Sequence, residues 1–351
     1  MIHDTPSIIR ELLNPALFPA ALATLFRVEG SSYRRCGARL LLERKGKRYG
    51  SISGGCLEDD LIERLRKLAP GTREEVIYDT TVENDLVWGV GLGCHGIVRV
   101  LLEHLGEPPS WATAAQQRLN QRLPATLIVD PSGTRFAESD QPRPSADEFV
   151  DQVEPPLRLA IFGAGEDARP LVCLAKTLGW TVEVRDPRPA LASNERFPEA
   201  DLIHAGHVET LTAELHPDPR TAAVIMTHSY RFDQPLLAAL LPLGLNYLGL
   251  LGPRRRAERL VADAGLGTEA LNSLRAPVGL DLGGDGPEAV ALAIVSEIQA
   301  VFGGRSGRPL RERTTPIHHD DTPRSESVTT PRVVTPFPLT TELDATAVSK
   351  L

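Results

Sequence analysis

The sequence predicts an α/β protein with a C-terminal Rossmann-type, doubly wound parallel sheet and a separate N-terminal α+β domain. The chain has 351 residues, whereas a compact domain usually takes about 100–200, so the length favours two domains. The second half alternates short apolar runs with helical segments, which is typical of a parallel sheet covered by helices. The segment 139–156 between the halves is polar and rich in proline, as expected of a linker.

The N-terminal domain is expected at residues 1–150 and mixes helices with strands. An amphipathic helix is predicted at the start and ends at Pro15, because proline cannot continue a helix. A second helix is predicted at Leu57–Leu68, where leucines recur at helical spacing. Short apolar runs bounded by turn residues predict strands. The further elements are strands near 21–30, 38–44, 75–79 and 97–103, a strand and turn at 48–55, a helix at 111–123 and a hairpin at 125–137.

The Rossmann-type domain is expected at residues 156–303. One helix is predicted at 167–179, and another at Pro287–Val301 closes the domain. Beyond this point the apolar periodicity stops, and the tail 304–351 is rich in Thr, Pro, Ser and charged residues, so we expect it to be largely disordered. The short apolar runs expected to form strands lie at 157–163, 181–186, 201–206, 222–228 and 245–252.

Charge and apolar patterning argue against two classes of protein. The formal net charge of −8 disfavours nucleic-acid binding, which usually needs a basic face. No apolar run reaches the roughly 18 residues of a membrane span, and the N-terminus lacks the pattern of a signal peptide. Four cysteines without a CxxC pair do not predict a disulfide framework, so a reducing cytoplasm is the simplest setting.

The segment GAGEDA, at residues 163–168, follows a predicted strand and opens a predicted helix. Gly163 permits the tight turn, and Gly165 leaves room for a phosphate to approach the N-terminus of the helix. Asp186 ends the next strand, about 20 residues further on, where an acid can bind ribose hydroxyls. The segment therefore predicts a nucleotide-type ligand in the Rossmann crevice. The alternative is that the glycines only allow close packing and that Asp186 caps the turn at Pro187.

Further polar residues follow strands of the same predicted sheet. Arg254, Arg255 and Arg256 lie in the first turn of a helix that follows one strand, and His228, Tyr230 and Asp233 lie at the end of another. Because the carboxyl ends of the strands face the ligand crevice, we expect these side chains to contact an anionic ligand. Arg185 and Arg188, which flank the acid at the end of the second strand, suit a ligand with a further phosphate. For the helix arginines, the alternative is a solvated helix face.

Two cysteines of the N-terminal domain lie in glycine-rich segments. Cys56 follows Gly54 and Gly55 at the start of a predicted helix, a position that favours the thiolate form. Cys94 lies in a second such segment, GVGLGCHG. Thiolate sulfur suits a soft metal or a sulfur transfer, so both thiols are candidate contacts to a metal cofactor. The alternative is that both are small buried residues, which is what we expect of Cys173.

Several longer segments go beyond generic fold patterns. In the first half they are GSSYRRCGARLLL, GSISGGCLE and GLGCHG. In the second half they are LAIFGAGEDARPL, MTHSYRFDQPLL, YLGLLGPRRRAERL and GLDLGGDGPEAVALAIVSEIQA. With these segments the chain resembles the XdhC/CoxI (CoxF) family, in order, from about Leu22 to His318. It departs from the family pattern at Cys36, where members usually have proline, and the tail beyond His318 lies outside the resemblance.

The resemblance implies a cofactor-binding chaperone for molybdenum enzymes of the xanthine dehydrogenase class, in preference to a catalyst. Such a protein carries molybdenum cofactor (molybdopterin) as cargo, supports its sulfuration with a cysteine desulfurase, and helps insert it into the enzyme. Carried over by position, Cys56 and Cys94 are the family's glycine-flanked cysteines, and Gly163, Gly165 and Asp186 belong to its Rossmann loop. The expected partners are the molybdoenzyme and the desulfurase, with a homodimer left open and without nucleic acid or membrane.

A second hypothesis is an NAD(P)-dependent oxidoreductase that uses the Rossmann domain. It explains GAGEDA and Asp186 but leaves the glycine-flanked cysteines of the first domain unexplained. The sequence also lacks the Tyr-x-x-x-Lys motif of short-chain reductases, a P-loop, an HExxH motif and a GxSxG elbow. A third hypothesis is an adaptor that docks a desulfurase and binds no cofactor.

Overall fold

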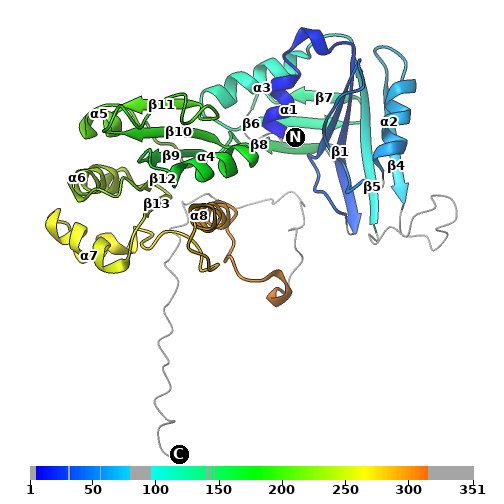
Figure 1. Cartoon of the computed structure of the whole chain (residues 1–351). Helices are drawn as coiled ribbons and strands as arrows, with labels where there is room; N and C mark the ends of the chain where they lie inside the picture. The colour runs from blue at the N-terminus through cyan, green and yellow to red at the C-terminus, as the bar shows by residue number, and fades with distance from the viewer. Residues whose placement is uncertain are drawn as a thin grey trace, which may run out of the picture. The chain divides into compact units, whose positions relative to one another are not determined.

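The computed structural model describes residues 5–30, 32–55, 57–79, 96–139, 142, 144, 145 and 147–314. These residues belong to one compact unit, and their strands form two antiparallel sheets and one parallel sheet (Figure 1). This organisation confirms the predicted fold class. Of the tail expected to be disordered, only residues 304–314 are described, and they include the short 3-10 helix η4 (Leu310–Glu312).

A five-stranded antiparallel sheet forms the first part of the chain. Its elements are β1 (Ala20–Gly30), β2 (Arg39–Glu43), β3 (Arg48–Gly50), α2 (Glu58–Lys67), β4 (Arg73–Asp79) and β5 (Gly96–Leu105), in the strand order β3-β2-β1-β5-β4. The central strand β1 is buried along residues 20–26, since it pairs with β2 on one side and β5 on the other. Helix α2 covers one face of this sheet, where Leu61 and Leu65 join the core of the strands.

A three-stranded antiparallel sheet with two helices forms the second part. Its elements are α1 (Thr5–Glu11), the 3-10 helix η1 (Pro15–Leu17), α3 (Ser110–Asn120), β6 (Ala125–Asp130), β7 (Gly133–Phe136) and β8 (Phe149–Val153), in the order β7-β6-β8. Strand β8 lies in the segment that we expected to be a linker, so that expectation is wrong for residues 149–153. The physical reason is tertiary: β8 is held by antiparallel pairing with β6. Because β8 runs across residue 150, the exact domain limits stay predictions.

The parallel sheet has the strand order β11-β10-β9-β12-β13, as Figure 1 shows. Its elements are β9 (Arg158–Phe162), α4 (Ala168–Thr177), β10 (Thr181–Asp186), β11 (Leu202–Ala205), α5 (Val208–Ala213), β12 (Thr221–Ile225), α6 (Tyr230–Leu240), the 3-10 helix η2 (Leu241–Leu243), β13 (Tyr247–Leu250), α7 (Arg254–Asp263), the 3-10 helix η3 (Thr268–Asn272) and α8 (Pro287–Phe302). Every strand pair in it is parallel. The predicted Rossmann-type, doubly wound sheet is therefore confirmed.

Alternating residues of the central strand β9 feed two cores, one on each face of the sheet. Leu159 and Ile161 pack with α4 and α8, whereas Ala160 and Phe162 pack with α5, α6 and α7. The strand order reverses between β9 and β12, so the carboxyl ends of these two strands form the switch point where such sheets bind ligands. No helix of the described segments is both long and apolar enough to span a membrane.

Candidate functional site

The turn after β9 depends on glycine at position 163. Gly163 has a φ of +135°, and a Cβ there would lie 2.5 Å from the carbonyl carbon and oxygen of Met226 and 2.8 Å from the nitrogen of Thr227. These are backbone atoms at the end of β12, so they cannot swing aside as a side chain would. The backbones on the two sides of the switch point are therefore in direct contact, and Gly163 is required for that contact.

Gly165, two residues further on, is in a different situation. Its φ lies outside the left-handed region, and a Cβ there would meet nothing within 4 Å. Neither backbone conformation nor neighbouring atoms demand glycine at this position. The residue faces open space just before α4, whose first two N–H groups, those of Ala168 and Arg169, donate to the carbonyl oxygens of the turn at 3.3 and 3.2 Å.

Asp186 lies at the carboxyl end of β10 and is fully buried. Its Oδ2 accepts hydrogen bonds from the backbone nitrogen of Ala164 at 2.6 Å and from Nη2 of Arg188 at 2.8 Å. Its Oδ1 accepts from the backbone nitrogen and Nε of Arg188, both at 2.8 Å. The carboxylate thus ties the glycine turn to Arg188, and both of its oxygens already have partners within the chain.

The two arginines that flank Asp186 differ from each other. Arg185 is 2% exposed and donates to Glu183 and to the carbonyl oxygen of Leu211, so the expectation that it faces a ligand is wrong. The reason is the alternation of side chains along β10, which turns Arg185 to the opposite face. Arg188 follows the strand and stays partly exposed, and its hydrogen bond with Asp186 raises the pKa of its guanidinium.

His228 lies just beyond β12, on the other side of the switch point. Its φ is +59°, a conformation that is uncommon for residues other than glycine and that clusters at functional sites. The ring Nε2 lies 2.8 Å from Oδ2 of Asp167, the residue that precedes α4. The side chain is exposed, so the pair forms an accessible polar bridge between the glycine turn and the end of β12.

Of the three arginines predicted in the first turn of α7, only Arg256 turns toward the protein interior. Arg254 and Arg255 are exposed, and Arg254 pairs with Glu258 one turn along the same helix. Arg256 instead points inward, with Nη2 2.6 Å from Oδ2 of the fully buried Asp233. The helical period could have identified it, because Arg256 lies one turn before the buried Leu260.

Asp233 also binds the end of β12. It accepts a short hydrogen bond from the hydroxyl of Thr227, whose carbonyl oxygen accepts from Nη2 of Arg188 at 3.3 Å. One polar network therefore links Arg188, Thr227, Asp233 and Arg256 beneath the switch point. The sequence placed Asp233 and Arg256 near the crevice, but it did not predict that Asp233 is fully buried or that the two residues pair with each other.

In the N-terminal sheet, the glycine segment before α2 wraps around the carboxylate of Glu58. Oε1 of Glu58 accepts from the backbone nitrogens of Ile52 at 3.1 Å and Ser53 at 2.7 Å, and Oε2 accepts from that of Gly55 at 3.0 Å. The hydroxyl of Ser53 donates to the same carboxylate and accepts from the nitrogen of Leu57 at 3.1 Å. Three backbone N–H donors of this segment are thus already occupied by an internal acid.

Of Cys56, Cys94 and Cys173, the structure describes only Cys173. Cys56 and Cys94 both lie outside the described residues. Cys173 is exposed on α4, so the expectation that it packs in the core is wrong. The helical period explains this, because the buried face of α4 runs through Ala168, Leu171 and Ala175. Among the described side chains, no group of three or more His, Cys, Asp or Glu is placed to hold a metal ion.

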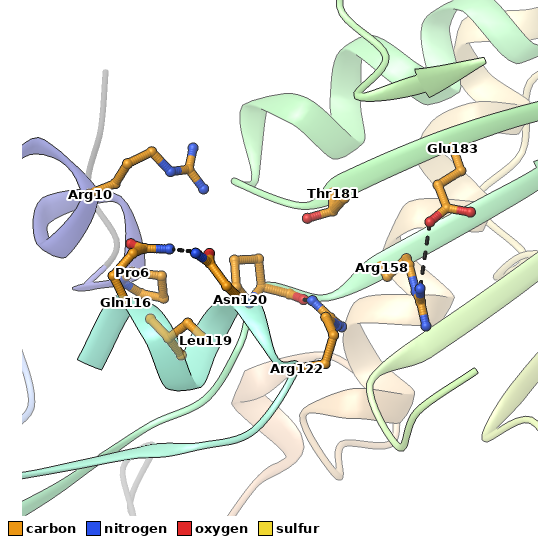
Figure 2. Close-up of a pocket in the computed structure, with 10 residues that line it drawn as sticks. Pro6, Arg10, Gln116, Leu119, Asn120, Arg122, Arg158, Thr181 and Glu183 are labelled. Carbon is orange, nitrogen blue, oxygen red and sulfur yellow. Dashed lines mark hydrogen bonds and ion pairs between the residues drawn. The ribbon is translucent and has the colours of Figure 1, made fainter. Parts of the chain in front are cut away.

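A cavity of about 230 Å³ lies at the amino ends of β9 and β10, the edge of the sheet opposite the switch point. Figure 2 shows its lining, in which Arg158 pairs with Glu183 and Arg122 donates to the carbonyl oxygen of Pro156. Arg122 and Arg158 also share Asp218, so both guanidinium groups have partners within the chain. This cavity is therefore separate from the candidate site.

Comparisons with known proteins cover both halves of the chain. The protein-family model described as XdhC Rossmann domain matches residues 159–298, and the family model described as XdhC and CoxI family matches residues 18–79. A Bacillus subtilis protein, named as a probable subunit of xanthine dehydrogenase, is 34% identical over 318 residues, covering 80% of this chain and 92% of the relative.

Two further similarities concern a bacterial chaperone and a solved structure. The Escherichia coli protein named molybdenum cofactor insertion chaperone PaoD is 27% identical over 290 residues, covering 80% of this chain and 83% of the relative. A crystal structure from Bacillus halodurans, described as a xanthine dehydrogenase, has 30% identity and a TM-score of 0.74, covering 88% of this chain and 99% of that one.

Proposed function

Because the chain belongs to the XdhC and CoxI family, we propose that it binds molybdenum cofactor as cargo and helps insert it into a xanthine dehydrogenase-type enzyme. In the finer form of the proposal, the bound cofactor is sulfurated with the help of a cysteine desulfurase before insertion. The E. coli relative named as an insertion chaperone supports the proposal, since it is similar over 80% of this chain.

The observation that carries the proposal is the open position at Gly165. A phosphate of the cofactor would lie there against the N-terminus of α4, where N–H groups and the helix dipole favour an anion. Arg188, which stays partly exposed, would add a guanidinium group beside it, braced by the buried carboxylate of Asp186. His228, Arg254 and Arg255 stay predicted contacts on the rim of the same site.

The cysteines supply the other half of the proposal. Cys56 and Cys94 would lie near the molybdenum or its sulfur, where a thiolate suits a soft metal. Gly55, which precedes Cys56, would let the backbone approach the cofactor, whereas the space beside the predicted contact Gly54 is filled by the ring of Tyr33. Cargo binding that depends on both the switch point and these thiols would distinguish a cofactor chaperone from an adaptor that only docks a desulfurase.

An NAD(P)-dependent oxidoreductase is the second candidate function, favoured by the sheet order and the glycine turn. The geometry of Asp186 weighs against it. In that class, the acid at the end of the second strand accepts hydrogen bonds from ribose hydroxyls, but this carboxylate is fully buried and bonded to Ala164 and Arg188. A dinucleotide would have to displace those internal bonds to bind in the usual way.

Anaerobic titration of the purified protein with molybdenum cofactor tests the proposal. We expect binding that falls at least about tenfold in Gly165→Val, because the valine side chain would occupy the open space before α4. Gly106→Val is the matched control, since Gly106 also has nothing within 4 Å but lies after β5, away from the Rossmann domain. Absence of cofactor binding by the unaltered protein, or tight NAD(H) binding with turnover of a carbonyl substrate, would refute the proposal.

The thiols are tested in the same titration with Cys56→Ala and Cys94→Ala. We expect weaker retention of the molybdenum and sulfur of the cofactor in at least one of them. Cys173→Ala serves as the control, because that thiol lies exposed on α4 in the other domain. Binding and metal retention equal to the unaltered protein in both cysteine variants would remove the thiols from the proposed site.

A further inference from the structure

Tyr33 is an exposed aromatic side chain beside the glycine segment before α2. It is 63% exposed, whereas every other aromatic side chain of the described residues is buried or half-buried. Exposing one aromatic ring forgoes the burial that stabilises the others. The ring lies next to Gly54, and this position suggests that its exposed face serves to bind a ligand.

The ring of Tyr33 lies flat against Gly54. A Cβ built on Gly54 would be 3.6 Å from each of Cε1, Cε2 and Cζ of the Tyr33 ring. A point equally distant from these three atoms lies on the axis through the ring centre, so the glycine meets the face of the ring and not its edge. One face of the ring thus rests on the backbone, and the exposed fraction places the other face in solvent.

The segment under the ring is firmly held. The carboxylate of Glu58 and the hydroxyl of Ser53 accept hydrogen bonds from backbone nitrogens on both sides of Gly54, including those of Ser53, Gly55 and Leu57. Glu58 is 9% exposed, which shields these bonds from competing water. Beyond the ring, Gly55 has a φ of +121°, and a Cβ built there meets no atom of the described residues within 4 Å.

We propose that Tyr33 is a stacking platform for the planar pterin ring of the cargo, with Glu58 as the residue that positions the platform. The inference rests on the proposed function, which supplies a ligand with such a ring. A fixed aromatic face open to solvent binds planar heterocycles through their π-faces, and a preorganised support lowers the entropy cost of doing so. In this proposal, recognition of the phosphate is left to the Rossmann domain.

Titration of the full chain with molybdenum cofactor, released anaerobically from a purified molybdoenzyme, tests the inference. We expect Tyr33→Ala to weaken binding about tenfold, within the range of a lost aromatic stack, and Tyr33→Phe to bind within about twofold of the unaltered protein. Ile77→Ala is the control, because it removes a similarly exposed side chain that is aliphatic and cannot stack; Ile77 is 58% exposed on β4. Since Tyr33 is exposed, its variants should keep the thermal midpoint of the unaltered chain.

The outcomes separate this inference from the proposed function. If the unaltered protein binds the cofactor and Tyr33→Ala binds equally well, the stacking platform is refuted and the proposed function stands. If Tyr33→Phe loses as much affinity as Tyr33→Ala, the hydroxyl is responsible and stacking is again refuted. If the unaltered protein binds no cofactor, the proposed function fails and this inference fails with it.

Discussion

Replacing Gly163 by alanine should destabilise the Rossmann domain strongly. The new Cβ would lie 2.5 Å from the carbonyl group of Met226 and 2.8 Å from the nitrogen of Thr227. A φ of +135° is also disfavoured for alanine, at a cost of about 1–3 kcal/mol. Relief of the overlap requires the backbones of the turn and of the end of β12 to separate, which adds about 1–3 kcal/mol, as overpacking does. The free energy of unfolding should therefore fall by roughly 2–6 kcal/mol.

Urea unfolding measures this loss when it is followed by the fluorescence of Trp180, which is 5% exposed in the core of the Rossmann domain. The other two tryptophans are replaced by phenylalanine so that the signal reports this domain alone. Gly165→Ala is the matched control: its Cβ meets nothing within 4 Å, so the free energy of unfolding should change by less than about 0.5 kcal/mol. Equal midpoints for the two variants would show that the contact between the turn and β12 is not what Gly163 provides.

Three further predictions concern buried and half-buried charges. Glu58→Gln should lower the free energy of unfolding by about 1–3 kcal/mol, because the neutral amide cannot serve all the N–H donors that now share the carboxylate; urea unfolding measures this. Arg256→Met should cost about 3 kcal/mol by the same measurement, since it leaves the fully buried Asp233 without its cation. Burial raises the pKa of Asp60, but hydrogen bonds from Tyr78 and a neighbouring arginine outweigh it and hold that pKa below its ordinary value. Ionised Asp60 therefore stabilises the fold at neutral pH, and the difference in thermal midpoint between the protein and Asp60→Asn should vanish as the pH falls below about 4.

Each of these predictions has a specific contrary result. An unchanged urea midpoint in Glu58→Gln would mean that water replaces the carboxylate without loss. For Arg256→Met, the double variant with Asp233→Asn should recover part of the stability, and a further loss would contradict the ion-pair argument. A stability difference for Asp60→Asn that grows as the pH falls would reverse the sign derived for that carboxyl.

Local sequence pattern was sufficient for most of the Rossmann domain. Strands such as β9 and β12 are largely apolar runs bounded by turn residues, and helices such as α4 have a clear apolar face, so these elements are specified by neighbours in the chain. Strand β8 was missed for the opposite reason. Its residues are mostly half-buried, and its pairing partner β6 lies about twenty residues away, so nothing local marks residues 149–153 as a strand.

The candidate site was predictable where residue type alone decides the outcome. Gly163 followed from the motif, because only glycine fits the approach of two backbones. It was harder to predict the direction of a side chain where it depends on which face of a strand or helix is buried. Arg185 alternates away from the site along its strand, and Arg256 rather than Arg254 turns inward along its helix. These assignments follow once the buried face of each element is known.

The two buried acids at the switch point bear on which ligand the site can take. Asp186 and Asp233 are both fully buried, and each is neutralised by an arginine, Arg188 and Arg256 respectively. Both carboxylates are already bonded within the chain and offer no free acceptor, while the guanidinium group of Arg188 stays partly exposed beside them. A guanidinium group favours phosphate over a ribose diol, which needs a free acceptor. The same two ion pairs therefore weigh against a dinucleotide bound in the usual way.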